Sequence, residues 1–303
     1  MLDASSPTER RKAIDAGSYD ATAGAFDALT ERFAAPLAER MLDLASLKPT
    51  DSLLDVGVGT GLVALRAAAR LERGEVVGID HSEGMLSQAI AKAVEQGVAD
   101  RTAFLTCDAE ALVFENDAFD AVASLFVLMH LPNPLAATRE MFRVLKPGGR
   151  VVIAVGSGPQ LASMQGLAAA ARAAPTWLSQ RCGQLLLAPQ YLRGLMIEHG
   201  LWSHQADDPH SHRVSVRDLL RTSGFASVST SWLGAAVELE PEDFWSVQAI
   251  YSSGPRIRLS SLEPERVSAL KADFMERTGR VRTRGGRLVY QYGALFHVAV
   301  KPK

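Results

Sequence analysis

Cysteine is scarce in this sequence, with only Cys107 and Cys182 among 303 residues. Two cysteines do not make a disulfide framework, so we expect a protein of the reducing cytosol. No apolar run reaches the length of a membrane-spanning helix, and the N-terminus "MLDASSPTERRKAIDAG" lacks the apolar core of a signal peptide. Neither sign of charge dominates, with 32 basic and 34 acidic residues, which argues against nucleic acid as a partner. These absences predict a cytoplasmic globular protein without a membrane span, and its 47% apolar content can form the core of one or two domains.

The most informative stretch is "LLDVGVGTGL" at 53–62, in which glycines occupy positions 57, 59 and 61. Residues 52–56 are mostly apolar and predict a short buried strand, whereas residues 62–70 have the composition and apolar spacing of a helix. Glycines in such a turn allow positive φ and let a ligand approach the backbone, and the following helix directs free N–H groups at an anion. The dinucleotide motif G-x-G-x-x-G would need glycine at position 62, which is Leu62. The turn therefore predicts a carboxylate or phosphate site and disfavours a nicotinamide oxidoreductase.

Strands and helices alternate over residues 51–156. We predict further strands at 75–80, 101–108, 118–126 and 150–156, with helices between them. One of these helices should begin after Ser82 and stop at Gly97. Such alternation predicts an α/β fold with a parallel sheet covered on both faces, and it places ligands at the carboxyl ends of the strands.

The remaining segments depart from this alternation. Residues 1–50 predict an N-terminal helical lid, and residues 157–214 predict an inserted helical cap. The last segment, 215–303, returns to the core with a capped helix, a strand at 226–239, a helical insertion near 241–279 and a final strand. We expect the last two strands to pair as a hairpin.

Acidic side chains end the second and third predicted strands. Asp80 could accept both hydroxyl protons of a ribose, and Asp108 could accept from an exocyclic amine such as the adenine N6. Met85, in the helix after Asp80, offers a polarizable apolar surface to a base. Since all of these groups stand at one edge of the predicted sheet, together with the glycine turn they predict a nucleoside ligand.

With these features in this order, the sequence resembles the class I S-adenosylmethionine-dependent methyltransferases. The stretches that carry the resemblance are "LLDVGVGTG", "VVGIDHSEGML", "LTCDAEAL", "FDAVASLFVLMHLPNP" and "LKPGGRVVIAV", within residues 19–156. The sequence is most similar to the group that contains ubiquinone/menaquinone C-methyltransferases and many small-molecule methyltransferases. The resemblance implies a three-layer Rossmann-like fold, in which a seven-stranded, mostly parallel sheet has an antiparallel last strand and carries the helical cap insertion. It also implies S-adenosyl-L-methionine as the cofactor.

The resemblance further assigns roles to individual residues. Gly57, Gly59, Thr60 and Gly61 would hold the methionine part of the cofactor, with Asp55 supporting their turn. The ribose, the adenine, the sulfonium and the covering N-terminal helices would be contacted by a second set of residues: Asp80, His81, Met85, Asp108, Ala109, Leu125, Phe126, Tyr19 and Phe33.

The predicted function is methyl transfer to a small, apolar or aromatic acceptor at oxygen, nitrogen or carbon, in which alignment of the reactants does most of the work. His130, in "FVLMHLPNP" beyond the fourth strand, is the candidate general base; packing of the loop before Pro132 is its alternative role. Two alternatives to methyl transfer stay open. One is a protein of the same fold that catalyses a cyclization or rearrangement, and the other is a non-catalytic partner of another methyltransferase. No pattern in the sequence specifies an oligomeric state.

Two other groups of residues have a functional and a structural interpretation. Histidines and carboxylates gather in the predicted cap, but no tight ligand pair falls on one helix face, so we predict a solvated polar loop and no metal: Glu198, His199, His204, Asp207, Asp208, His210 and His212. Aromatic and methionine side chains of the two insertions could wall an apolar acceptor pocket or belong to the core: Trp177, Tyr191, Met196, Trp202, Trp232, Phe244 and Trp245.

Overall fold

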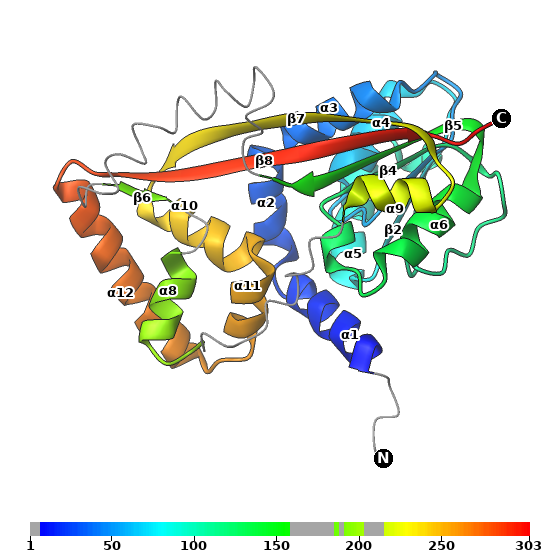
Figure 1. Ribbon diagram of the computed structural model, residues 1–303. Helices are drawn as coiled ribbons and strands as arrows, with labels where there is room; N and C mark the ends of the chain where they lie inside the picture. Colours follow the sequence, from blue (N-terminus) through cyan, green and yellow to red (C-terminus); the bar gives the residue numbers. More distant parts are fainter. Residues whose placement is uncertain (1–6, 158–184, 188–190, 203–214) are drawn as a thin grey trace, which may run out of the picture. The chain divides into compact units, whose positions relative to one another are not determined.

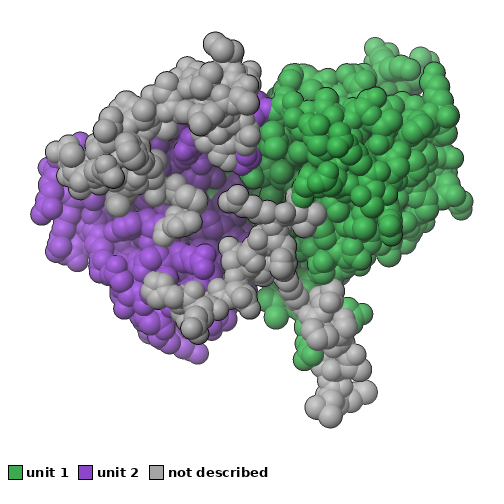
Figure 2. Space-filling model, in the orientation of Figure 1, with its two compact units in different colours: residues 1–156, 212–231, 294–303 green, residues 157–211, 232–293 purple. Residues whose placement is uncertain are grey.

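A computed structural model describes residues 7–157, 185–187, 191–202 and 215–303 (Figure 1). The chain divides into two compact units (Figure 2). Unit 1 consists of residues 1–156, 212–231 and 294–303, and unit 2 consists of residues 157–211 and 232–293.

Unit 1 is built on a mixed sheet. Its parallel strands are β1 (Leu53–Val56), β2 (Val76–Asp80), β3 (Thr102–Thr106), β4 (Phe119–Leu125) and β5 (Leu145–Gly156). They lie in the order β3-β2-β1-β4-β5, and β8 (Arg287–Val300) continues the sheet antiparallel to β5. β7 (Ala226–Leu239) pairs with β8, so the predicted hairpin and the predicted antiparallel last strand are confirmed.

Helices cover both faces of this sheet. On one face, α3 (Ala35–Ala45) contacts β4, β5 and α4 (Leu62–Arg70), while α5 (Glu83–Glu95) contacts β2 and β3. On the other face, α6 (Pro134–Val144) and α9 (Val216–Thr222) bury one apolar cluster against alternate strand residues. Such a sheet between two helical layers is the three-layer arrangement that the alternation predicts.

Two helices of unit 1 begin at the caps that their sequences provide. The Ser82 hydroxyl accepts a hydrogen bond from the backbone N–H of Met85 at 3.1 Å, which satisfies a free donor at the start of α5. Gly97 follows α5 with φ of +67°, the left-handed conformation that ends many helices. The hydroxyl of Ser215 accepts from the N–H of Asp218 in the same way at the start of α9.

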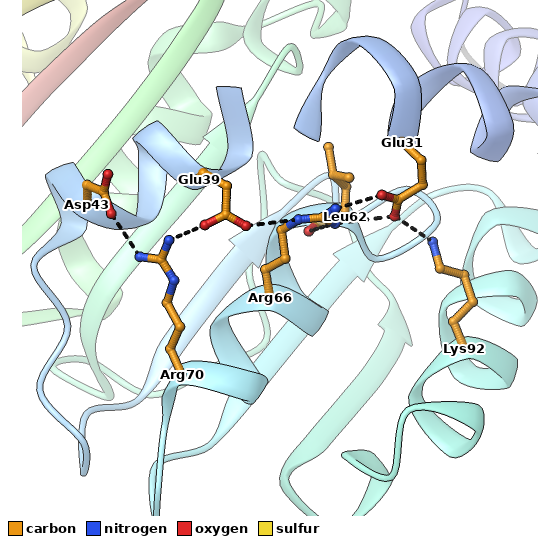
Figure 3. Close-up of polar contacts among 7 residues, drawn as sticks. All are labelled: Glu31, Glu39, Asp43, Leu62, Arg66, Arg70 and Lys92. Carbon is orange, nitrogen blue, oxygen red and sulfur yellow. Dashed lines mark hydrogen bonds and ion pairs between the residues drawn. The ribbon is translucent and has the colours of Figure 1, made fainter. Parts of the chain in front are cut away.

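The N-terminal residues form α1 (Pro7–Asp20) and α2 (Ala23–Phe33) before α3. A row of side chains of alternating charge joins α2 and α3 to α4 and α5, which pack on the sheet (Figure 3). Arg66 of α4 binds Glu31 of α2 at 2.6 Å and Glu39 of α3 at 3.2 Å. Lys92 of α5 extends the row from Glu31, and Arg70 extends it from Glu39. Shared partners of this kind fix both helices more firmly than isolated surface pairs would.

The described residues of unit 2 are mostly helical, in α8 (Tyr191–Glu198), α10 (Pro241–Ser246), a π-helical turn (Val247–Tyr251), α11 (Ser253–Ser260) and α12 (Pro264–Thr283). Its core is aromatic, because the ring of Phe274 makes edge contacts with Tyr191 and Trp245 at centroid distances of 5.4 and 5.1 Å. A short strand that the sequence analysis did not predict, β6 (Leu185–Leu187), pairs in parallel with the start of β8. A run of three leucines does not distinguish strand from helix by periodicity, and its pairing with β8 decides the conformation.

In the described ranges no helix combines the length and the apolar character that crossing a membrane requires. Those same ranges contain no group of three or more His, Cys, Asp or Glu side chains that could hold a metal ion. Five residues of the predicted polar loop lie outside the described residues: His204, Asp207, Asp208, His210 and His212.

Candidate functional site

The glycine turn between β1 and α4 has a backbone that side chains rarely allow. Gly57, Gly59 and Gly61 have φ of +73°, +53° and +90°, all in the left-handed region. A Cβ on Gly57 would lie 2.2 Å from Cγ2 of Val127, whereas a Cβ on Gly59 would meet no atom within 4 Å. Gly57 is therefore required by packing as well as by conformation, and Gly59 leaves open space beside the backbone.

Two carboxylates stabilise this turn and the helix that follows it. Asp55 is buried in β1, and its Oδ2 accepts a hydrogen bond from the backbone N–H of Ala64 in the first turn of α4, at 3.0 Å. Burial raises the pKa of Asp55 to about 7. Asp80, at the end of β2, accepts from the N–H of Gly59 at 2.9 Å and from the N–H of Ser82 at 3.0 Å. Asp80 thus ties the glycine turn to the start of α5, and desolvation raises its pKa too.

The third predicted acid, Asp108, follows β3 and is bound by a lysine of α1. Nζ of Lys12 donates to Asp108 Oδ2 and to Glu110 Oε2, both at 2.7 Å. The other oxygen of Asp108 accepts from the N–H of Glu110 at 2.9 Å, and Nε2 of His81 lies 3.6 Å away. Burial alone would raise the pKa of Asp108, but the bonds from Lys12 and from the Glu110 N–H hold it below its usual value.

The other residues predicted around the adenine differ in exposure. Met85 and Ala109 are buried, while His81 is exposed. Cys107 is buried as well and has a free thiol. The structure therefore brings Asp80, His81 and Asp108 to the carboxyl edge of β2 and β3, and Met85 is a buried residue in the first turn of α5.

The loop after β4 carries an unusual backbone conformation. Phe126 has φ of +62°, which is costly for an aromatic residue. Its N–H donates to the carbonyl of Ala154 in β5 at 2.8 Å, so the hydrogen bonding to β5 continues one residue beyond the end of β4. The side chain of the next residue, Val127, packs under Gly57. The end of β4 is thereby joined to the glycine turn.

A short 3-10 helix, η2 (Leu128–His130), follows Val127 and positions His130. Nδ1 of His130 lies 3.4 Å from Oδ2 of Asp15 on α1, and both side chains are largely shielded from solvent, at 19% and 21% exposure. The ring of Tyr19 stands edge-on to the His130 ring at a centroid distance of 6.2 Å. The structure thus brings Tyr19 and His130 together, while Phe33 is a buried residue of α2 covered by Arg32.

Another residue of α1 contacts the loop between β2 and α5. Oδ1 of Asp20 accepts from the Ser82 hydroxyl at 2.6 Å and from the N–H of Gly84 at 2.8 Å. A carboxylate at this point also favours the positive end of α5. Asp20, Asp15 and Lys12 are not among the residues predicted for the site. The sequence marks only Lys12, which ends the basic block Arg10-Arg11-Lys12, and that block does not reveal a partner nearly a hundred residues away.

Comparison with known proteins gives the family of this fold and site. A family profile described as "Methyltransferase domain" matches residues 54–153. The nocamycin O-methyltransferase of Saccharothrix syringae is 30% identical over 269 residues, which cover 85% of this chain and 88% of that protein. The demethylmenaquinone methyltransferase of Thermus thermophilus is 42% identical over 114 residues. That match covers 38% of this chain, which spans about half, 51%, of that protein's length.

Solved structures confirm the fold at lower sequence identity. The YcgJ protein of Bacillus subtilis superposes with a TM-score of 0.54 at 18% identity, covering 88% of this chain and 98% of that chain. The cyclase SpnF superposes with a TM-score of 0.51 at 21% identity, covering 89% of this chain and 82% of that chain. Since the nocamycin relative aligns with most of both sequences, the protein belongs to the class I S-adenosylmethionine-dependent methyltransferases.

Proposed function

We propose that this methyltransferase acts on an oxygen of a small acceptor, with His130 as the base that removes the acceptor's proton. The observation that carries the proposal is the pair of His130 and Asp15, in the loop after β4 whose Val127 contacts Gly57 of the glycine turn. A base oriented by a carboxylate is an arrangement well suited to proton removal. The nocamycin relative, an O-methyltransferase by name, supports oxygen as the methylated atom.

The glycine turn fits the methionine part of the cofactor. Gly59 leaves open space beside its backbone, and the buried Thr60 hydroxyl has no hydrogen-bond partner among the described residues. A buried polar atom of this kind calls for a ligand or water. Asp80 keeps lone pairs for ribose hydroxyls, because each carboxylate oxygen can accept more than one hydrogen bond. The full cofactor set in this proposal is the predicted one: Tyr19, Phe33, Asp55, Gly57, Gly59, Thr60, Gly61, Asp80, His81, Met85, Asp108, Ala109, Leu125 and Phe126.

S-adenosylmethionine, when bound, supplies a methyl group on a sulfonium, which is already an activated electrophile. The residues of the chain then have to align the acceptor and exclude water, and alignment of this kind can lower a barrier by roughly 7–11 kcal/mol. A general base contributes a further ~10²–10⁴-fold where the acceptor must lose a proton. His130 would provide that second contribution.

The acceptor in this proposal is apolar or aromatic and belongs to specialised metabolism, as the nocamycin relative suggests. Several side chains predicted to wall its pocket are core residues of unit 2, because Trp232, Phe244 and Trp245 are buried. Tyr191 contacts the aromatic core through Phe274, but it is only partly buried, as is Trp202, so this proposal keeps both as candidates for lining the pocket. Trp177 lies outside the described residues.

The test is release of S-adenosylhomocysteine from S-adenosylmethionine with phenolic and enolic acceptors. We expect release with some of them, and we expect His130→Gln to lower turnover by about 10²–10⁴-fold while affinity for S-adenosylhomocysteine stays the same. His199→Gln is the matched control, because that histidine pairs with Asp273 in unit 2. Wild-type turnover in H130Q would contradict the role of His130. An acceptor converted without release of S-adenosylhomocysteine would instead indicate the cyclization or rearrangement chemistry of the alternative hypothesis.

A further inference from the structure

One face of α1 contacts the candidate site at successive positions. Lys12, Asp15 and Tyr19 are three and four residues apart, so they lie on the same side of the helix. Lys12 binds Asp108 and Glu110 after β3, and Asp15 and Tyr19 contact His130 after β4. This face of α1 therefore touches the carboxyl edge of two separate strands of the sheet.

We infer that Asp15 is a positioning residue that fixes the tautomer and the orientation of His130, an inference that rests on the proposed role of His130 as the base. The carboxylate faces Nδ1 at 3.4 Å. An acceptor at this nitrogen favours the tautomer with the proton on Nδ1, which leaves the lone pair on Nε2 to receive a proton. Once the proton has moved to Nε2, the negative charge of Asp15 stabilises the imidazolium.

The distance between the two groups is compatible with this role. It is about half an ångström longer than an ordinary N–H···O bond, and the two groups are not aligned as a hydrogen bond in this structure. Catalytic hydrogen bonds are often long or poorly aligned without substrate and tighten when it binds. The side chains of both residues are mostly shielded from solvent, so water screens their attraction less than it does at an exposed pair. The Tyr19 ring, edge-on to the imidazole, restricts rotation of the histidine ring from a second side.

Contacts on both sides of Asp15 determine its position. Lys12 is anchored by two carboxylates, and Asp20 accepts from the hydroxyl of Ser82 and the N–H of Gly84. Both anchors join α1 to residues that the proposal assigns to the cofactor or places directly beside them. Binding of cofactor and placement of the base would thus depend on the same helix.

The decisive experiment is ¹⁵N NMR of the His130 ring in the full-length protein without cofactor, at a pH at which the ring is neutral. H130Q identifies the resonances among the seven histidines. We expect wild type to hold the Nδ1–H tautomer and Asp15→Ala to shift the ring toward the Nε2–H tautomer. Alanine favours helix, so α1 should persist in D15A. The same tautomer in wild type and D15A would overturn the inference.

Asp20→Ala is the matched control, because it removes a carboxylate of α1 whose two hydrogen bonds go to Ser82 and Gly84, in the loop between β2 and α5. We expect its His130 ring to keep the wild-type tautomer. An equal shift of the His130 tautomer in D15A and D20A would overturn the inference, because it would show that loosening α1 is enough to change the tautomer.

Kinetics provide a second readout with an acceptor that wild type methylates. We expect D15A to lower kcat by roughly tenfold or more, yet by less than H130Q, with KM for S-adenosylmethionine little changed and with partial rescue in Asp15→Glu. Unchanged kcat in D15A would overturn the inference. Failure of the proposed function would look different, because wild type would then release no S-adenosylhomocysteine, while the NMR comparison needs no acceptor and would still decide the role of Asp15.

Discussion

At the scale of residues, two glycines of the left-handed turn are needed for different reasons. At Gly57 a side chain would clash with Val127, so this position serves the packing of the free protein. At Gly59 there is no such neighbour, and the positive φ alone opposes a side chain. A substitution at Gly59 therefore tests ligand approach with little change in packing.

We predict that Gly59→Ala lowers the free energy of unfolding by only ~1–2 kcal/mol but weakens binding of S-adenosylhomocysteine at least tenfold, since its methyl group would occupy the space left for the cofactor. Calorimetry and urea unfolding measure the two effects. Gly97→Ala is the control, with φ of +67° and no atom near its Cβ, and it should cost similar stability and leave binding intact. Equal binding in G59A and wild type would contradict the placement of the cofactor at this turn.

Phe126 presents the opposite case, because a bulky residue occupies a conformation that favours glycine. We predict that Phe126→Gly is more stable than Phe126→Ala by about 1 kcal/mol, the reverse of the order expected in ordinary strand or helix positions. Comparing the two variants removes the contribution of the lost ring. Urea unfolding of both proteins gives the difference, and an alanine variant at least as stable as the glycine variant would show that Phe126 is not strained in solution.

At the scale of elements, signals local to one helix or strand were predictable and partners distant in sequence were not. The cap at Ser82, the stop at Gly97 and the strand alternation follow from neighbouring residues, and the structure has them. The pairing of Lys12 with Asp108 depends on the angle at which α1 packs, which no periodicity encodes. The same holds for Asp15 and His130, so the histidine was predictable from its position after β4 and its carboxylate partner was not.

The last strand carries a titratable group in an apolar setting. His297 of β8 lies opposite Ile153 of β5, is almost fully buried, and its Nδ1 has no hydrogen-bond partner among the described residues. Burial, with the charge of Arg217 as a second cause, lowers the pKa of His297 to about 4. The unfolded chain therefore binds a proton at this residue at a higher pH than the folded protein does.

It follows that His297 contributes stability that is present above about pH 6.5 and is lost as the pH falls toward 4. We predict that His297→Leu removes this loss. When the pH falls from 7.5 to 4.5, the free energy of unfolding of the variant should rise relative to that of wild type by about 2–3 kcal/mol. Urea unfolding at the two pH values measures the gain. A difference between the two proteins that stays constant across this range would show that His297 does not titrate in this way.

At the scale of the whole molecule, all residues proposed to bind the cofactor lie in unit 1, between Tyr19 and Phe126. They come from three regions, namely the glycine turn with the ends of β2 and β3, the end of β4, and the helices before β1. Unit 2 has its own aromatic core around Phe274 and its own ion pairs, in which Arg277 of α12 binds Glu198 of α8. These contacts join the helices of unit 2 to one another and involve none of the residues proposed to bind the cofactor.

This division predicts where cofactor binding changes hydrogen exchange. A ligand that binds only the folded state stabilises it by RT ln(1 + [L]/Kd), about 2.7 kcal/mol at a hundredfold excess over Kd. Saturation with S-adenosylhomocysteine should slow amide exchange in the glycine turn, at the start of α5 and in α1, whose Lys12 and Asp20 contact the proposed adenine and ribose loops. Residues 264–283 of α12 serve as the internal control and should exchange at the same rate with and without ligand. Protection confined to the glycine turn, with α1 unchanged, would mean that this helix is not coupled to the cofactor, whereas equal protection in α12 would mean that the ligand acts on both units.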